Sequence, residues 1–213
     1  MLFNGSESNL LISDLVGKLR NKQTEAADFR NSLRRLGNFL AYESAKYLDS
    51  ELVQVETPLG KVNYNRIQDN ITVIIILRAA LSMSEGVIEV FSNAKLGVIS
   101  ASRGKKLQKD GKDFRIDCTY SNIPYLEDTN VMIVDPMLAS GSTLLYVIQQ
   151  IKEQKPRKII VLCAIASKYG INRIQTKYPE IHILVGAVDE ELNDKGYIVP
   201  GLGDAGDRAF NTL

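Results

Sequence analysis

One stretch of the chain combines a carboxylate, three hydroxyls and a glycine within nine residues, 135–143. Residues 131–134, which precede it, are apolar on both faces, as is typical of a buried parallel strand. Apolar residues follow it at helical spacing from Leu144 to Ile151. The stretch is therefore a predicted helix N-terminus, where free amides and the positive end of the helix dipole favour a phosphate group.

Asp135 lies at the end of the strand, beside this predicted phosphate site. A carboxylate accepts hydrogen bonds from sugar hydroxyls, so the combination suits a ribose 5-phosphate. An alternative is that Asp135 and Ser140 only cap the helix, which is a common role for these residue types. The residue types alone leave both interpretations open.

Two arginines follow other predicted strands. Arg78 comes directly after the apolar run 71–77, and Arg103 follows a predicted strand at 96–100. An arginine at the end of a buried strand needs an anionic partner, and the carboxyl ends of parallel strands meet at one edge of a sheet. Arg78, Arg103 and Asp135 are thus expected to form one site for an anionic sugar. Either arginine could instead belong to a structural ion pair.

The segment 196–208 holds four glycines and one proline. Its spacing Gly201-x-Gly203-x-x-Gly206 matches a dinucleotide-binding motif, but that motif opens a βαβ unit and only seven residues follow Gly206. A glycine-rich loop also exposes main-chain N–H and C=O groups. The edge of a pyrimidine base alternates the same groups, so this loop is predicted to bind such a base.

Alternating strands and helices must position these residues. Helices are predicted at 9–20, from Thr24 as the capping residue to Asp49, at 83–91, after Thr143 and at 169–178, and strands at 52–57, 62–64, 71–77, 96–100, 131–134, 158–167 and 182–188. The pair 52–57 and 62–64 is predicted to form a hairpin. This order indicates an α/β fold with a mostly parallel central sheet flanked by helices.

The predicted organisation is a single domain over 1–213. Residues 1–50 form a helical extension that packs on the domain or contacts another subunit. Residues 104–130, which include Lys105, Lys106, Lys109 and Lys112, are predicted as a flexible loop or long exposed hairpin able to close over a diphosphate. A solvated excursion without function is the alternative.

Composition excludes several classes of protein. The 213 residues carry 26 basic and 25 acidic side chains, which argues against an extended nucleic-acid surface. No signal-peptide pattern is present at residues 1–9, and no apolar run approaches the roughly 20 residues of a membrane span. A cytoplasmic enzyme without a membrane partner is expected. Cys118 and Cys163 do not have metal-site spacing, and the single histidine, His182, is predicted to be structural.

Three motifs carry a resemblance to a known family. Residues 134–143, Val-Asp-Pro-Met-Leu-Ala-Ser-Gly-Ser-Thr, resemble the phosphoribosyl diphosphate (PRPP) signature of type I phosphoribosyltransferases, in the form Asp-Pro-Met-Leu-Ala-Thr-Gly-Gly-Ser found in uracil phosphoribosyltransferases. Residues 196–207 are nearly identical to that family's uracil-binding tail, and residues 76–79 are similar to its Ile-Leu-Arg-Ala-Gly. Ala80 and Ser102 depart from the family pattern and resemble an archaeal subgroup, while Ser140 and Ser142 stand where the family motif has Thr and Gly.

The resemblance implies a type I phosphoribosyltransferase fold, with a hairpin or hood, and transfer of the 5-phosphoribosyl group from PRPP to uracil, giving UMP and diphosphate in pyrimidine salvage. The uracil-binding tail would be 196–213. It implies Mg²⁺ held through the diphosphate and water, with no dedicated protein ligand. Arg103 and Asp204 are the implied catalytic residues. The implied PRPP-binding residues are Arg78, Arg103, Asp135, Pro136, Met137, Leu138, Ala139, Ser140, Gly141, Ser142, Thr143 and Asp204, and the implied uracil-binding residues are Ile198, Gly203, Asp204 and Ala205.

Relatives in this family assemble as homodimers or homotetramers, and some are activated by GTP and inhibited by CTP. Two other functions share the PRPP signature. One is a regulator that binds RNA and senses UMP, which the balanced charge and the uracil-type tail oppose. The other is a purine phosphoribosyltransferase, which the tail also opposes.

Overall fold

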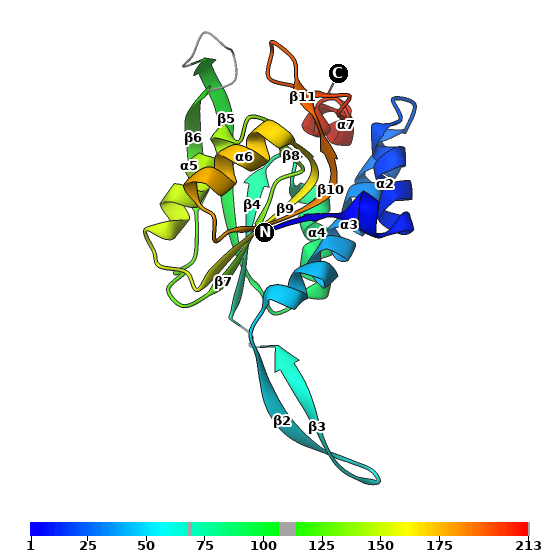
Figure 1. Ribbon diagram of the computed structural model, residues 1–213, viewed down its shortest axis with the longest axis vertical. Helices are drawn as coiled ribbons and strands as arrows, with labels where there is room; N and C mark the ends of the chain where they lie inside the picture. The colour runs from blue at the N-terminus through cyan, green and yellow to red at the C-terminus, as the bar shows by residue number, and fades with distance from the viewer. Residues whose placement is uncertain (68–69, 107–113, 213) are drawn as a thin grey trace.

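The computed structural model describes residues 1–67, 70–106 and 114–212, with the backbone alone at positions 103, 105 and 106. Within these residues, a sheet of eight strands has the order β1-β10-β9-β7-β4-β5-β6, with β8 beside β9 (Figure 1). The strands are β1 Leu2–Asn4, β4 Ile71–Leu77, β5 Lys95–Lys106, β6 Phe114–Asn122, β7 Asn130–Val134, β8 Met137–Leu138, β9 Lys158–Ser167 and β10 His182–Asp189. All pairs are parallel except β5 with β6.

The central strands are buried on both faces, as their uninterrupted apolar sequences predict. In β4, Val73 and Ile75 point into one core, while Ile74 and Ile76 point into a second core on the other face. The predicted bounds of β4 and β9 agree with the structure. The sheet is therefore the middle layer of three.

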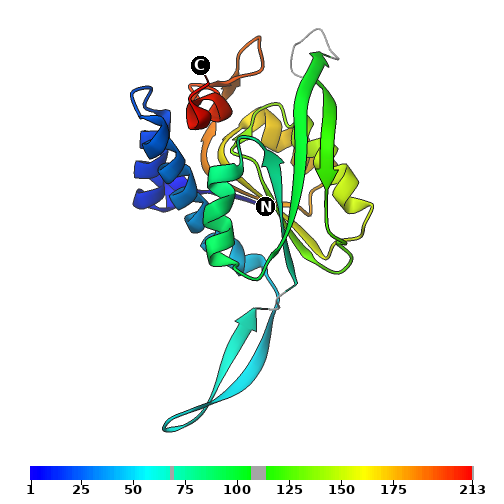
Figure 2. The same ribbon diagram turned by 180° about the vertical axis from the view of Figure 1, so that it is seen from behind.

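Helices cover both faces of the sheet (Figures 1 and 2). One core receives residues of α2, α3, α4 and α7, and the other receives residues of α5 and α6. The helices are α1 Gly5–Ser8, α2 Leu10–Arg20, α3 Ala26–Ser44, the 3₁₀ turn η1 Ala45–Tyr47, α4 Leu81–Val90, α5 Ser142–Lys152, α6 Lys168–Lys177 and α7 Ala205–Phe210. In the described residues, no helix combines the length and hydropathy that crossing a membrane requires.

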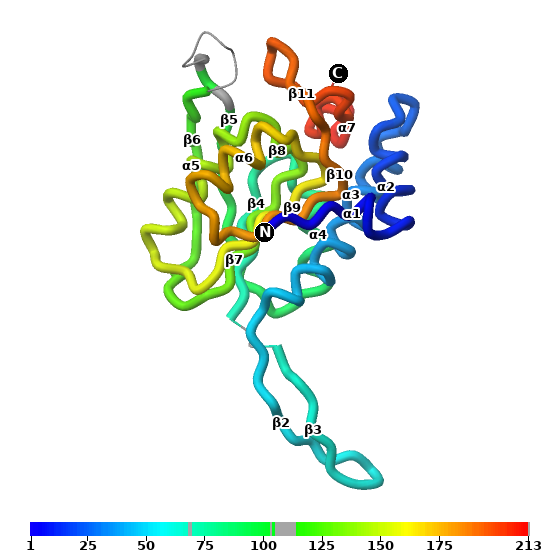
Figure 3. The backbone as a smooth tube through the Cα atoms, viewed as in Figure 1, coloured from blue at the N-terminus to red at the C-terminus, as the bar shows by residue number. Residues whose placement is uncertain are grey.

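A second, two-stranded sheet projects away from this body. Strands β2 Ser50–Thr57 and β3 Gly60–Ile67 pair antiparallel and form a long arm (Figure 3). The predicted hairpin is thus present and is longer than the sequence pattern indicated. A third small sheet, β11 Glu191–Leu192 with β12 Ile198–Val199, lies in the C-terminal segment.

The prediction that a strand ends at residue 100 was wrong. Strand β5 continues to Lys106 because its second half pairs with β6, and Arg103 lies opposite Ile116 within this hairpin instead of at a strand end. Cys118 lies in β6. The segment 104–130, predicted as a flexible loop or long exposed hairpin, contains the end of β5 and all of β6, which pair antiparallel. Its residues 107–113, with Lys109 and Lys112, lie outside the described residues.

One predicted helix cap was also wrong. Helix α3 begins at Ala26 with Glu25 at its N-cap position, whereas Thr24 Oγ1 donates a hydrogen bond to the Lys18 carbonyl, 2.7 Å away. Thr24 therefore closes the turn between α2 and α3. This turn contacts the C-terminal segment, because Arg208 donates to the Asn21 carbonyl.

Candidate active site

The predicted phosphate site forms a tight elbow, residues 135–143, between β7 and α5. Strand β7 ends at Val134, and helix α5 begins at Ser142. Gly141 has a φ of 78°, the left-handed conformation that glycine adopts without strain. Ser142, which replaces a glycine of the family motif, is the first residue of the helix and does not have a positive φ. Its side chain is therefore compatible with the turn.

Two of the three elbow hydroxyls hydrogen-bond within the protein. Ser140 Oγ and Ser142 Oγ lie 3.1 Å apart and are buried. Arg173 of α6 donates to the Ser140 carbonyl at 2.8 Å and to Ser142 Oγ at 3.2 Å. The amide of Phe114 also donates to Ser142 Oγ, at 3.3 Å. These contacts brace the elbow, and Thr143 is the hydroxyl residue that lines the adjoining pocket.

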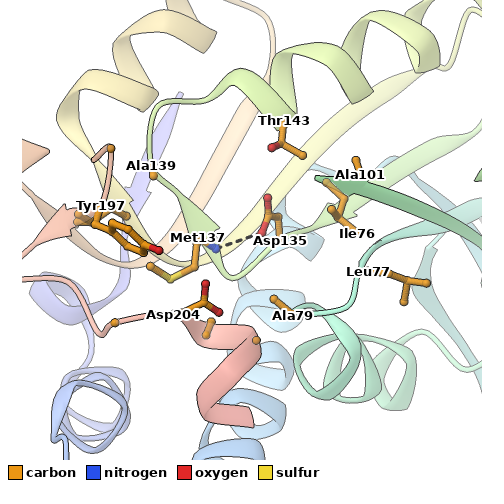
Figure 4. Close-up of a pocket in the computed structure, with 15 residues that line it drawn as sticks. Ile76, Leu77, Ala79, Ala101, Asp135, Met137, Ala139, Thr143, Tyr197 and Asp204 are labelled. Carbon is orange, nitrogen blue, oxygen red and sulfur yellow. Dashed lines mark hydrogen bonds between the residues drawn. The ribbon is translucent and has the colours of Figure 1, made fainter. Parts of the chain in front are cut away.

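A pocket of about 320 Å³ lies between the elbow and the C-terminal tail. Figure 4 shows Asp135 and Thr143 of the elbow and Asp204 of the tail around it. Its lining residues are Ile76, Leu77, Ala79, Ala101, Asp135, Met137, Ala139, Thr143, Gly196, Tyr197, Ile198, Gly203, Asp204, Ala205 and Gly206. The structure thus brings together the elbow, the end of β4 and the glycine-rich tail.

Asp135 is nearly buried at the carboxyl end of β7. Its Oδ1 accepts a hydrogen bond from the Met137 amide at 3.2 Å (Figure 4), which fixes the start of the elbow. Cys163 of the neighbouring strand β9 is fully buried. Burial, and then the negative charge of Asp135, raise the pKa of the Cys163 thiol well above its ordinary value, so this cysteine stays neutral.

Asp204 faces the pocket and also begins a helix. Its side chain accepts a hydrogen bond from the Asp207 amide at 2.9 Å and so caps α7. The glycine-rich sequence of this segment predicted a loop, and α7 was not predicted. The signal was present, because an aspartate placed three residues before a second acidic residue is a helix-start pattern. Gly203, just before the cap, has a φ of 83°.

Arg78 does not line the pocket. Its Nη2 donates to Asp207 Oδ1 at 2.6 Å and to Thr212 Oγ1 at 3.0 Å, and its guanidinium carbon lies 5.5 Å from the centre of the Phe210 ring. The end of β4 is therefore joined to the tail by an ion pair. The backbone of Arg103 lies in β5, and its side chain is outside the part of the chain that the structure describes.

The N-terminal helices, for which the sequence indicated packing or a subunit contact, also contact the tail. Arg208 donates to the carbonyls of Leu202 at 2.7 Å and of Asn21 at 2.6 Å, and stacks 4.3 Å from the centre of the Phe29 ring. Burial lowers the pKa of Arg208. Arg30 of α3 donates to the Ala209 carbonyl at 2.7 Å. These contacts could not be foreseen, because nothing in the sequence pairs α2 or α3 with the tail.

The sequence matches the family profile described as "Uracil phosphoribosyltransferase" over residues 6–212. The chain belongs to the uracil phosphoribosyltransferase family. Uracil phosphoribosyltransferases of Thermococcus gammatolerans and Pyrococcus furiosus are each 44% identical to it over 96% of its length and over 91% and 88% of theirs. The Methanococcus maripaludis uracil phosphoribosyltransferase is 41% identical over 96% of this chain and 87% of its own length.

Solved structures agree with the fold. A protein from Aquifex aeolicus has a TM-score of 0.89 at 39% identity, with 99% of this chain and 98% of that chain covered. A hypoxanthine phosphoribosyltransferase from Staphylococcus aureus, 14% identical with 76% of each chain covered, has a TM-score of 0.50 and shares the fold alone. The predicted family, the type I phosphoribosyltransferase fold and the enzyme class are confirmed.

Proposed function

We propose that the chain transfers the 5-phosphoribosyl group of PRPP to uracil, forming UMP and diphosphate, in the pocket between the elbow and the tail. The observation that carries this proposal is the shared lining of that pocket. Asp135 and Thr143 line one part, and Ile198 and Gly203 to Ala205 line the other. A volume of about 320 Å³ suits a small ligand enclosed by both segments.

PRPP is proposed to bind along residues 135–143. The 5-phosphate would sit at the N-terminus of α5, where the Thr143 hydroxyl is available and the helix dipole favours negative charge. Asp135 would accept hydrogen bonds from the ribose hydroxyls. Ser140 and Ser142, which already hydrogen-bond to one another, would keep the elbow rigid. The elbow would then lose less conformational entropy when PRPP binds.

Uracil is proposed to bind against the tail, through Ile198, Gly203, Asp204 and Ala205. Main-chain N–H and C=O groups there can pair with the alternating edge of the base. Cytosine would leave one such group without a partner, and a buried unpaired group strongly disfavours the wrong ligand. Discrimination between the two bases would therefore come from the backbone of the tail.

In the reaction, the bond between the anomeric carbon and diphosphate breaks while that carbon bonds to a ring nitrogen of uracil, which loses its proton. The sugar should pass through an oxocarbenium-like state, so catalysis rests on stabilising the departing diphosphate and aligning the base. Arg103 and Arg78 are the proposed cationic residues. To bind the diphosphate, Arg78 would give up its ion pair with Asp207 or contact both groups at once. Asp204 is the candidate general base, unless uracil binds as its anion.

Mg²⁺ is the proposed cofactor. Asp135 and Asp204 give the pocket carboxylate oxygens, the donor type that Mg²⁺ prefers. Among the described residues, no group of three or more potential ligands gathers as a metal site, so the ion would be held mainly by the diphosphate and water. When bound, it would neutralise charge on the leaving group.

The remaining proposals concern the setting of the enzyme. We expect a homodimer or homotetramer that acts in the cytoplasm. Activation by GTP and inhibition by CTP stay predictions, as do the roles assigned to individual residues of the elbow and tail.

The proposal is tested by a turnover assay with PRPP, Mg²⁺ and a panel of free bases, measured with and without GTP. We expect UMP and diphosphate from uracil, and little or no product from cytosine or hypoxanthine. Failure to form UMP from uracil, or faster turnover of hypoxanthine, would contradict the proposal.

A variant links this activity to the pocket. Asp135→Asn keeps the shape of the side chain but removes the charge that pairs with ribose hydroxyls. We expect kcat/KM for PRPP to fall by about 10- to 100-fold, the range for hydrogen bonds to a charged group. Asp14→Asn, which removes an exposed carboxylate of α2 that pairs with Lys18, is the matched control and should leave kcat/KM unchanged.

A further inference from the structure

An ion pair behind the pocket holds one glycine of the tail. Arg20, the last residue of α2, donates from Nη1 to Asp189 Oδ2 at 2.8 Å and from Nη2 to Asp189 Oδ1 at 2.6 Å. The two parallel bonds make a bidentate pair, a geometry that fixes the guanidinium plane of Arg20 relative to the carboxylate plane of Asp189. The Asp189 side chain, at the end of β10, is only 6% exposed.

Both main-chain polar groups of Gly201 bind to this pair. The Gly201 amide donates to Asp189 Oδ2 at 2.9 Å, and the Gly201 carbonyl accepts from Arg20 Nη1 at 2.9 Å. Arg20, Asp189 and Gly201 thus close a ring of hydrogen bonds, which we call the clamp. An ion pair that served only to join α2 to the sheet would not need to engage a single tail residue from both sides.

The turn held by the clamp is tight. Gly201 has a φ of 59°, and a Cβ at this position would overlap the carbonyl oxygen of Ile198. Glycine is therefore required, and it carries no side chain that could fix the turn by packing. The clamp supplies the fixed contacts that the missing side chain cannot.

Neither charged residue of the clamp lines the pocket between the elbow and the tail. Arg20 instead faces a separate cavity on the other side of the tail, which Gly201 and Leu202 also line. Gly201 lies between Ile198 and Gly203, and both of these residues do line the active-site pocket. Any effect of the clamp on substrate must therefore pass through the tail backbone.

We propose that Arg20 and Asp189 are positioning residues for the base: by fixing Gly201, they hold the main-chain groups of residues 198–205 in the arrangement that recognises uracil. This inference rests on the proposed function. It assigns a role in substrate recognition to the N-terminal helical extension. It also predicts a selective effect, because the PRPP elbow has its own supports in α6 and is not bonded to the clamp.

The test is steady-state kinetics of Arg20→Ala in the full chain. We expect the KM for uracil to rise by about tenfold or more, as for lost hydrogen bonds to charged groups, with the KM for PRPP within about twofold of the wild type. Guanidinium ion at low millimolar concentration should lower the raised uracil KM, because it can restore the bidentate contact to Asp189. Methylammonium, which cannot form that contact, should not.

Two further variants keep the outcome clear. Arg20→Lys keeps the charge but loses the planar fork, so the uracil KM should still rise severalfold even if the alanine variant does not fold. Arg34→Ala removes the exposed pair between Arg34 and Glu89, 2.7 Å apart, and should change neither KM. A wild-type protein that fails to convert uracil would refute the proposed function. A competent wild type with Arg20 variants of unchanged uracil KM, or with both KM values raised equally, would overturn the clamp alone.

Discussion

The surroundings of His182 determine its protonation state. Its ring stacks on Tyr47 with centroids 4.2 Å apart, and its Nδ1 has no hydrogen-bond partner among the described residues. Burial lowers the pKa of His182 below its ordinary value of 6.5, and the positive charges of the N-terminus and Lys158 lower it further. The folded protein therefore disfavours the protonated ring.

This shift predicts a pH dependence of stability. Between the lowered pKa of the folded state and the ordinary pKa near 6.5, the unfolded chain binds more protons, so the free energy of unfolding falls as pH decreases through that window. Above pH 6.5 the ring is neutral in both the folded and the unfolded chain, so His182 no longer lowers the free energy of unfolding. His182→Phe keeps an aromatic ring against Tyr47 but does not titrate. Urea unfolding from pH 7 to pH 5 should show a shallower loss of stability in this variant, and an unchanged slope would contradict the assignment.

The chemistry of single residues was predictable only where the backbone fixes their place. Asp135 follows a buried strand, so its position at the sheet edge follows from the sequence. Arg78 follows a buried strand too, but its partner Asp207 lies 129 positions away and no local pattern identifies it. The same limit applies to Ser142, because no local pattern identifies Arg173 as the donor to its hydroxyl.

At the scale of elements, the elbow depends on how closely α6 approaches it. Ser167 Oγ donates to the Ala139 carbonyl at 2.6 Å and accepts from the Gly170 amide at 2.9 Å. A Cβ on Gly170 would overlap the Ala139 carbonyl oxygen and lie 2.9 Å from Leu138 Cδ1. Glycine at this position lets the first turn of α6 support the elbow.

Gly170→Ala should therefore displace the elbow. We expect the KM for PRPP to rise and the free energy of unfolding to fall by about 1–3 kcal/mol, as for overpacked interiors. Gly17→Ala is the matched control, because a Cβ at Gly17 in α2 would meet nothing within 4 Å. That change should stabilise the helix by about 0.5–1 kcal/mol and leave the KM unaltered. Kinetics and urea unfolding of both variants would decide, and wild-type values for Gly170→Ala would contradict this account.

Elements were predictable in proportion to the strength of their periodicity. The apolar runs of β4 and β9 fixed their bounds, whereas β8, β11 and β12 have two residues each and show no period. The extension of β5 beyond residue 100 depends on pairing with β6, a contact between segments that a local pattern does not contain. The tail helix α7 was missed because its glycine content indicated a loop.

At the scale of the whole molecule, the arm formed by β2 and β3 is unusual in having one apolar face that the chain leaves uncovered. Val55 lies opposite Val62 in the ladder, and Val53 lies opposite Tyr64 on the same face. Val55, Val62 and Tyr64 are 39–49% exposed, and Leu59 at the tip is fully exposed. The other face is mostly polar: it carries Gln54, Asn63, Glu56, Lys61 and Asn65, with Leu52 opposite Asn65.

A hairpin of two strands is marginally stable alone, so an arm that projects from the body as in Figures 2 and 3 needs a partner for its apolar face. The expected homo-oligomer supplies one, since two arms related by a two-fold axis would place identical apolar faces together. We therefore expect the wild type to be a dimer or larger.

The ladder itself provides a matched pair of variants. Val55→Lys with Val62→Lys puts two charges opposite one another on the apolar face, and Gln54→Lys with Asn63→Lys does the same one step along the ladder on the polar face. Both introduce like-charge repulsion of similar size within the arm. Only the first should yield monomers in light scattering after size exclusion, because only there would the charges be buried between subunits. A monomeric wild type, or equal dissociation of both variants, would show that this face of the arm does not join subunits.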